Sequence, residues 1–425
     1  MADHQRYAVI SSDCHGGANL LDYRDYLDSS YHEEFDRWAA AYEIPYEDLK
    51  GEDGNRNWDS ERRLKELEED GVVAEVLFPN TIPPFFAASS LGSQRASESR
   101  QDLDRRWAGL QAHNRWLADF CAQAEGRRSG VFQIMLYDVD QAAREIRWAV
   151  DAGLRGGLLL PGTPPGSGLP PLYYHERYDD LWRTCAELGV PINCHSGSAA
   201  PRTGDRPEDH VFFMLDLRWW DQRTLRHLIL GGVLERHPGL RVVFTEEGLG
   251  WIPAQLKAMD DFCRSMRADS SGELSHGAQV AGNLSLLPSE YWTRQCYVGA
   301  SFMHPSETAI RERIGVGQIM WGSDYPHVEA SYPYSREAIS FSYAGVPEAE
   351  VERMLGGTAA ELFGFDMGLL QPIAERVGPL RRQVAQGIDP ADLPDGVVKC
   401  PAFAGVVPGS AQSRWADNRK GQAGS

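Results

Sequence analysis

Residues 7–15, YAVISSDCH, join a short apolar run to an Asp-x-His pair. The same arrangement returns in residues 190–195 (VPINCH), 240–246 (LRVVFTE) and 318–324 (QIMWGSD), where an apolar run ends at a histidine, a glutamate or an aspartate. Apolar runs that are continuous, rather than alternating with polar residues, are typical of strands buried on both faces of a parallel sheet. These four segments therefore predict a parallel sheet that carries polar side chains at the ends of its strands.

Eight apolar runs of this kind divide the chain, at residues 7–12, 73–79, 130–136, 157–160, 190–194, 240–245, 295–300 and 318–322. Patterns typical of helices separate most of them, at residues 60–69, 138–152, 175–188, 223–236 and 306–314. Such alternation indicates parallel strands joined by crossover helices. Eight repeats favour closure into an α/β fold of the (β/α)8 TIM-like barrel type over an open doubly wound sheet.

The barrel is predicted to occupy residues 1–366, with residues 19–70 as an insertion after the first strand. Residues 196–220, rich in Arg, Asp and aromatic residues, are predicted to form a long loop after the fifth strand. Residues 367–425 are predicted to be a C-terminal extension, with one helix near residues 369–386 and a flexible tail of about twenty residues.

The composition argues against several classes of partner. The chain has 425 residues, 42 % of them hydrophobic, and a formal net charge of −19. This acidity disfavours nucleic acids and anionic membranes, although a metal or a local arginine can still attract an anionic substrate. There is no signal-like N-terminal run, no stretch apolar enough to span a bilayer, and no CxxC pair among the seven cysteines. The sequence thus predicts a cytoplasmic protein that acts on a small molecule.

Four of the eight predicted strands end in groups that can bind a metal, at the place where parallel barrels carry their active residues. Alternation along a strand places Asp13 and His15 on the same face. Two imidazoles and three carboxylates that converge on one barrel mouth suit zinc, iron or manganese. The candidate ligands are Asp13, His15, His195, Glu246 and Asp324.

Each of these residues also has a plainer interpretation when it is taken alone. A lone histidine such as His195 is more often structural than a ligand, and Asp324 could cap the segment that follows it. Glu246 could pair with Arg241. The coincidence at four strand ends favours a metal site over three separate explanations.

Five motifs carry a family resemblance: SSDCH (11–15), NCHSGS (193–198), RHPGLRVVFTEEGLGWIP (236–253), MWGSDYPHVE (320–329) and GGTAAELFGFD (356–366). Together they resemble the amidohydrolase superfamily over about residues 7–365. The resemblance is to the amidohydrolase-related (amidohydrolase 2) branch, which includes the aromatic-acid and aminocarboxymuconate-semialdehyde decarboxylases. It implies that Asp13 and His15 match the two first-strand ligands of that family, and that His195 and Asp324 match those of the fifth and eighth strands.

One position departs from that branch, which usually has a histidine where this chain has Glu246. With Asp13 and Asp324, Glu246 makes three carboxylates, enough to balance most of the charge of two divalent ions. TEEG (245–248) and PNTIPPFF (79–86) are similar to an actinobacterial subgroup around the non-haem di-iron acyl-CoA thioesterase of platensimycin-type diterpenoid biosynthesis. The predicted activity is therefore hydrolysis of an acyl carbonyl in a thioester, ester or amide, with a CoA thioester as one candidate substrate. One or two ions per chain are expected, iron or zinc ahead of manganese.

Hydrolysis would use a water that loses its proton near neutral pH on a metal. Asp324 would take that proton, Glu246 would help to hold a second ion, and His327 is a candidate to orient a ligand or a leaving group. A surface or capping role is the plainer alternative for His327. The alternative reaction is non-oxidative decarboxylation of an aromatic or unsaturated acid, with Asp324 as the proton donor. A third interpretation is a non-catalytic barrel that only binds a metal or a ligand.

Four further residues are candidates for contact with the substrate. Arg202 could bind a carboxylate or phosphate, while Phe85, Phe86 and Trp251 could wall the pocket. Surface ion pairing is the plainer role for Arg202, and core packing for the aromatic residues. The family resemblance also predicts a homodimer.

Overall fold

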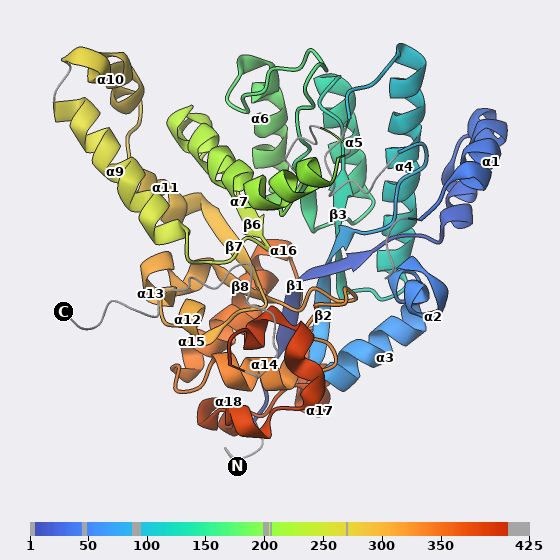
Figure 1. Cartoon of the computed structure of the whole chain (residues 1–425), viewed down its shortest axis with the longest axis vertical. Helices are drawn as coiled ribbons and strands as arrows, with labels where there is room; N and C mark the ends of the chain where they lie inside the picture. Colours follow the sequence, from blue (N-terminus) through green and yellow to red (C-terminus); the bar gives the residue numbers. More distant parts are fainter. Residues whose placement is uncertain are drawn as a thin grey trace.

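Eight parallel strands form the centre of the molecule (Figure 1). The computed structural model describes residues 5–44, 49–86, 95–198, 204, 206–268 and 271–406. Each strand pairs with the next in chain order. The ring closes where the backbone N–H of Asp324 donates to the carbonyl of Asp13 at 2.8 Å and that of His15 to Tyr325 at 2.7 Å. The predicted TIM-like barrel is confirmed. The strands are β1 (Val9–Gly16), β2 (Val72–Pro79), β3 (Arg128–Gln133), β4 (Gly157–Leu159), β5 (Ile192–His195), β6 (Val242–Thr245), β7 (Cys296–Ser301) and β8 (Ile319–Gly322).

Helices surround the barrel and connect its strands. The helix predicted at residues 138–152 is present as α5, and the Asp138 carboxylate caps it by accepting a hydrogen bond from the backbone N–H of Gln141. The helices before β4 are α1 (His32–Ala41), α2 (Gly51–Gly54), α3 (Ser60–Asp70), α4 (Arg100–Ala122) and α5 (Val139–Asp151). Those from β4 to β7 are α6 (Asp179–Leu188), α7 (Pro207–Leu230), α8 (Val233–Arg236), α9 (Ile252–Ala268), α10 (Ser275–Gly282) and α11 (Pro288–Gln295). After β7 come α12 (Pro305–Thr308), α13 (Arg311–Ile314), α14 (Ser335–Ser342), α15 (Glu348–Glu352), α16 (Thr358–Phe363), α17 (Met367–Val377) and α18 (Arg381–Gln386).

The long loop predicted after β5 is wrong for most of its length, because α7 begins at Pro207. Proline suits the first turn of a helix, where its missing N–H is not needed. The Asp209 carboxylate accepts from the backbone N–H of Arg206 at 3.1 Å and so closes the start of the helix. Residues 199–203 and 205 of that prediction lie outside the described residues.

The single helix predicted near residues 369–386 is two helices, α17 and α18. The break at Gly378 and Pro379 meets the start of the chain, since the backbone N–H of Tyr7 donates to the Pro379 carbonyl at 3.0 Å. A Cβ on Gly378 would lie 2.0 Å from the Tyr7 carbonyl oxygen, so this approach requires glycine. The predicted flexible tail falls on residues 407–425, outside the described residues.

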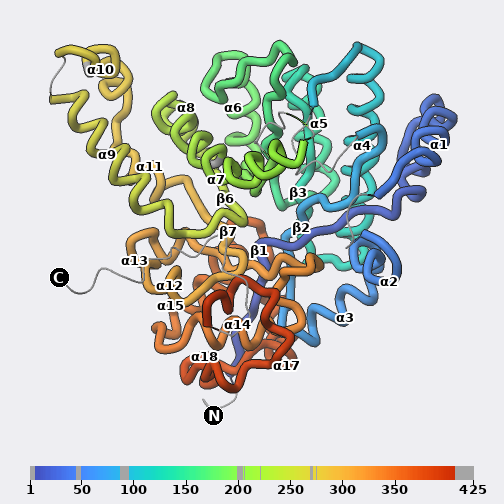
Figure 2. Tube along the Cα trace, viewed as in Figure 1, coloured from blue at the N-terminus to red at the C-terminus, as the bar shows by residue number. Residues whose placement is uncertain are grey.

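Helix α17 of the C-terminal extension covers the end of the barrel where the strands begin. Figure 2 shows α17 and α18 beside the N-terminal segment. Leu370 and Ala374 of α17 are buried in one cluster with strand residues such as Ile10, Val73 and Val131. This end is therefore largely apolar, and the candidate metal ligands lie at the opposite end, where the strands finish. No helix in the described ranges is long and apolar enough to cross a membrane.

Candidate metal centre

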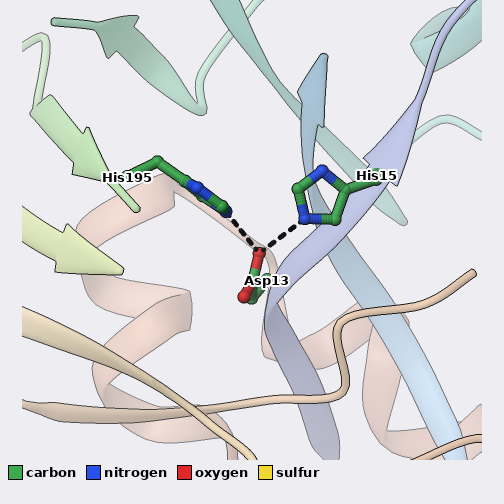
Figure 3. Close-up of side chains that lie close together, drawn as sticks. All are labelled: Asp13, His15 and His195. Atoms are coloured by element: carbon green, nitrogen blue, oxygen red, sulfur yellow. Dashed lines mark hydrogen bonds and ion pairs between the residues drawn. The ribbon is translucent and has the colours of Figure 1, made fainter. Parts of the chain in front are cut away.

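Asp13 lies between two imidazoles at the end of the barrel where the strands finish (Figure 3). Its Oδ1 is 3.3 Å from Nε2 of His15 and 3.3 Å from Nε2 of His195. Asp13 and His15 are both within β1, which runs farther than its apolar part, and His195 is the last residue of β5. All three side chains are almost fully buried. The sequence-predicted residues from two distant strands are thus brought into direct contact.

Asp324 joins this group from the segment after β8. Its Oδ1 lies 3.0 Å from Nε2 of His15 and 2.9 Å from Nδ1 of His327. The two imidazoles are stacked, with ring centroids 4.1 Å apart. Asp324 has a φ of 62°, a left-handed conformation that is uncommon for residues other than glycine. Such strain is typical of functional sites, where the surrounding structure holds an unfavourable backbone in place.

Glu246, which follows β6, has the same uncommon conformation, with a φ of 63°. Its Oε2 is 3.7 Å from Nε2 of His195. One carboxylate oxygen each from Glu246, Asp13 and Asp324 lie within 4.8 Å of one another. Arg241 is directed elsewhere and donates to the carbonyls of Pro238 and Leu240. The alternative pairing of Glu246 with Arg241 is therefore absent.

The carboxyl groups of the centre differ in their acidity. Burial would raise the pKa of Asp13, but the imidazoles of His195 and His15 outweigh burial and hold it below its usual range. Burial likewise opposes a fall in the pKa of Asp324, yet His327 and His15 lower it. Burial and then repulsion from Asp324 raise the pKa of Glu246 well above its usual range. The metal-free site thus favours the anionic forms of Asp13 and Asp324, and it favours the protonated form of Glu246 more than water does.

The pKa values of the two buried imidazoles, His15 and His195, are shifted upward. Burial lowers the pKa of His15 and His195, but the neighbouring carboxylates outweigh it, so both pKa values are raised. Asp13 acts on both histidines; Asp324 adds to its effect on His15, and Glu246 to its effect on His195. In the absence of an ion, the carboxylates stabilise the protonated imidazoles, and the imidazoles stabilise the carboxylate charges.

Two polar residues that carry no chemical signal in the sequence hold this cluster. Ser301, the last residue of β7, donates a hydrogen bond from its Oγ to Oδ2 of Asp13. Asn80, next after β2, places its Oδ1 3.3 Å from Nε2 of His327. The Nδ2 of Asn80 donates to Oδ1 of Asn57 at 2.7 Å, and Asn57 donates in turn to the Gly54 carbonyl at 2.9 Å. The insertion therefore fixes the orientation of His327 through two amides.

The donor set fits a divalent metal. Three overlapping groups place their ligand atoms within 4.8 Å of one another: Asp13 with His15 and His195, His15 with Asp324 and His327, and Asp13 with Glu246 and Asp324. Both nitrogens of His15 and Oδ2 of Asp324 are buried and make no hydrogen bond to a described residue. Buried polar atoms without partners are rare. Nε2 of His15 lies 3.3 Å from Oδ1 of Asp13 and 3.0 Å from Oδ1 of Asp324, on the side of the ring where the acidic groups gather. Imidazole and carboxylate together suit zinc, iron or manganese.

Three of the four predicted substrate contacts, Phe85, Phe86 and Trp251, pack against aromatic rings or an arginine. Phe85 is buried among aromatic rings of the insertion, with centroids 5.8 Å from Trp38 and 6.1 Å from Tyr31. The Arg106 guanidinium lies 5.8 Å from the ring of the buried Phe86. Trp251 packs against Phe244 and Trp292 rather than against the metal centre. Arg202 lies outside the described residues. Contact of these four residues with a substrate stays a prediction.

A (β/α)8 barrel with a buried acid–imidazole cluster at the ends of its strands defines a metal-dependent barrel enzyme. The chain belongs to the amidohydrolase family, whose model matches residues 61–365. The predicted family membership is confirmed.

Two curated relatives are decarboxylases. The chain is 26 % identical to the gamma-resorcylate decarboxylase of Rhodococcus jostii over 314 residues, which is 72 % of this chain and 87 % of the relative. It is 23 % identical to the 2-amino-3-carboxymuconate-6-semialdehyde decarboxylase of Dictyostelium discoideum over 321 residues, 73 % of this chain and 77 % of the relative. Among solved structures, the 5-carboxyvanillate decarboxylase of Novosphingobium aromaticivorans, complexed with manganese and 4-hydroxy-3-methoxy-5-nitrobenzoic acid, matches with a TM-score of 0.62. That match is 18 % identical and covers 86 % of this chain and 99 % of the other.

These comparisons contradict the prediction of acyl hydrolysis by a thioesterase-like enzyme and agree with its alternative, decarboxylation. The prediction of hydrolysis counted Glu246 as a third negative charge that would help to balance a second ion. In the metal-free site, burial and the nearby Asp324 raise the pKa of Glu246, so its formal charge alone does not call for a second ion. The preference for iron or zinc also finds no support, since the metal named in the matched structure is manganese.

Proposed function

We propose that this chain is a metal-dependent decarboxylase that removes CO2 from an aromatic carboxylic acid without oxidation. The observation that carries the proposal is the buried convergence of Asp13, His15, His195 and Asp324 at the barrel mouth. The two curated relatives support the reaction class, and the solved structure with manganese and a nitrobenzoic acid supports the class of ligand.

Asp13, His15, His195 and Asp324 would hold one divalent ion, for which manganese is the first choice because carboxylate ligands suit it. When bound, the ion anchors the substrate carboxylate and stabilises negative charge near it. Ser301 keeps Asp13 directed at the centre through its hydrogen bond. Phe78 lies with its ring centroid 4.6 Å from that of His195 and gives the centre an apolar wall.

Decarboxylation breaks the bond between the ring carbon and the carboxylate carbon, and the electron pair of that bond stays on the ring. The ring carbon then needs one proton. Glu246 and Asp324 have carboxyl oxygens within 4.8 Å of each other, and the raised pKa of Glu246 keeps a proton on this pair. We propose that the proton carried by Glu246 passes to Asp324 and from Asp324 to the ring carbon, so that Asp324, an anion at rest, is protonated only transiently. His327 orients Asp324 through the contact at 2.9 Å. CO2 leaves with the two carboxylate oxygens, and water returns the proton to the pair.

The test is turnover of hydroxylated benzoates in deuterated water. The manganese-loaded protein is incubated with 2,6-dihydroxybenzoate, 5-carboxyvanillate and related acids, and CO2 and the ring product are measured. We expect CO2 release, with one deuterium at the carbon that lost its carboxylate. The Asp324→Asn variant is the matched control, and it should release CO2 at least 100-fold more slowly, as expected when a general acid is lost.

Absence of CO2 from every acid tested, with the metal bound and the protein folded, would contradict the proposal. Deuterium at another carbon would contradict the assigned proton transfer. A homodimer and a cytoplasmic location remain predictions from the sequence.

A further inference from the structure

A cavity lies outside the barrel, and no residue of the metal centre lines it. Its volume is about 670 Å³. The walls are the last turns of α7, the short α8, Tyr174 and the end of α10, and we call it the α8–α10 cavity. Figure 2 shows that α9 and α10 extend away from the strands on this side of the molecule. The volume lies within the range of about 300–1,000 Å³ that is usual for small-molecule sites.

The charged residues of this cavity differ in whether they are paired. Arg236 binds Asp179 at 2.9 Å, and Glu235 accepts hydrogen bonds from Ser285 and Tyr291. In contrast, the Nε of Arg226 is buried and has no hydrogen-bond partner in the part of the chain that the structure describes. A guanidinium always carries its charge and its five N–H donors, so a buried unpaired N–H is unfavourable. Arg226 thus lines the cavity without an ion pair or hydrogen bond to another described residue, and a ligand would reach its terminal N–H groups rather than the buried Nε. The Glu235 carboxylate is also part of the wall, so an anion would bind at the Arg226 end.

His227 is the neighbour of Arg226 on α7 and also lines the cavity. Its ring lies between Tyr173 and Tyr174, with centroids 6.1 Å and 5.6 Å away. Burial, and then Arg223 and Arg226, lower the pKa of His227 to about 4, so the imidazole is neutral near pH 7. Its Nδ1 is buried and has no hydrogen-bond partner among the described residues. A neutral imidazole next to a guanidinium can give a second hydrogen bond to a bound anion.

The remaining lining is largely apolar. Leu230 of α7, Val280 of α10 and Leu284 face the cavity together with the ring of Tyr174. Val280 and Tyr174 are exposed, at 39 % and 40 %, although both are large apolar or aromatic residues. A ligand that matches this surface needs an anionic group at one end and an apolar body behind it. An inorganic anion would leave the apolar wall uncovered.

We propose that the α8–α10 cavity is a binding site for a small aromatic carboxylate, whose carboxylate is bound by Arg226 and His227 and whose ring lies against Tyr174, Leu230 and Val280. This site is separate from the metal centre. The proposal goes beyond decarboxylation and does not depend on it, because binding can be measured without turnover.

The experiment uses 4-iodobenzoate as the probe. Crystals of the full chain are soaked with it, and the iodine is located by anomalous scattering. Calorimetry then compares the wild type with Arg226→Gln, and with Arg183→Gln as a matched control, since Arg183 is an exposed arginine on α6 that pairs with Asp180. Thermal unfolding confirms that each variant is folded. The neutral analogue 4-iodobenzamide tests the need for the charge.

We expect an iodine peak in the cavity, whether or not a second peak is present at the metal centre. Arg226→Gln should weaken that site at least tenfold, Arg183→Gln should change it less than twofold, and the benzamide should bind at least tenfold more weakly than the benzoate. A peak confined to the metal centre, or equal binding by the wild type and Arg226→Gln, would overturn the proposal. Equal binding of benzoate and benzamide in the cavity would overturn the assignment of an anion site.

Discussion

Replacing Ser301 by alanine tests whether the cluster around Asp13 is a metal centre. The Ser301 hydroxyl donates to Oδ2 of Asp13, while Oδ1 faces His15 and His195. Loss of the hydroxyl leaves Oδ2 without this donor in a buried position and lets the carboxylate turn away from the histidines. A hydrogen bond to a charged group contributes about 1.5–3 kcal/mol, which corresponds to roughly 10- to 100-fold in binding. Loss of groups that orient metal ligands typically weakens metal binding by about the same factor.

The assay is a competition between metal-free protein and a fluorescent chelator for Mn2+. Ser301→Ala should bind Mn2+ about 10- to 100-fold more weakly than the wild type. Ser342→Ala is the matched control, because Ser342 also donates from a buried hydroxyl, to the carbonyl of Met303, but lies outside the cluster. Metal-free Ser301→Ala should lose about 1.5–3 kcal/mol of stability, because its hydrogen bond is to a charged group, and Ser342→Ala about 1 kcal/mol. Ser342→Ala should keep its metal affinity. The reasoning is refuted if folded Ser301→Ala binds Mn2+ within twofold of the wild type, or if Ser342→Ala is equally impaired.

Three further predictions concern protonation, acidity and metal removal. Glu246→Gln should keep its Mn2+ affinity within about threefold but lower turnover at least tenfold, because a neutral amide replaces a neutral acid that holds a proton; a large loss of affinity would mean that Glu246 binds the metal as a carboxylate. Burial raises the pKa of Asp70 from 3.8 to about 7, so its contribution to folding is greatest below pH 3.8 and is lost as the pH rises to about 7. Denaturant unfolding should therefore show Asp70→Asn gaining up to about 4 kcal/mol on the wild type between pH 4 and pH 8, and a constant difference would exclude this shift. Addition of Mn2+ at about 100 times its dissociation constant should raise the free energy of unfolding of the metal-free protein by about 2.7 kcal/mol, and equal thermal unfolding with and without Mn2+ would argue against a site in the native state.

The strands and the main site residues could be predicted because one physical pattern specifies both. Strands buried on both faces read as continuous apolar runs, and the first polar residue after such a run stands out. His195, Glu246 and Asp324 were found in this way. Asn80 and Ser301 follow or end strands as well, but an amide or a hydroxyl is common at such places and carries no titratable or metal-binding signal of its own. Their role depends on which side chains the fold brings beside them.

Other features depend on conformation or environment rather than on residue type. The left-handed backbone of Glu246 and Asp324 leaves no trace in the sequence, because neither residue is glycine. The charge of Glu246 was counted from its formal value, whereas its protonation depends on burial and on Asp324. The first part of helix α7, residues 207–222, was missed because Val211, Phe212 and Leu215 are exposed on it, at 55–72 %, so its apolar residues do not form the single buried stripe of a surface helix.

The most direct test of the metal centre is a crystal structure of the manganese-loaded protein, with anomalous data collected at the manganese absorption edge. One strong peak is predicted within bonding distance of Asp13, His15, His195 and Asp324, at full occupancy in the wild type. A second full-strength peak held by Glu246 would contradict the single-ion centre. A peak at another site, or none in protein that has been supplied with excess Mn2+, would contradict the assignment of these four residues as metal ligands and with it the proposed decarboxylation.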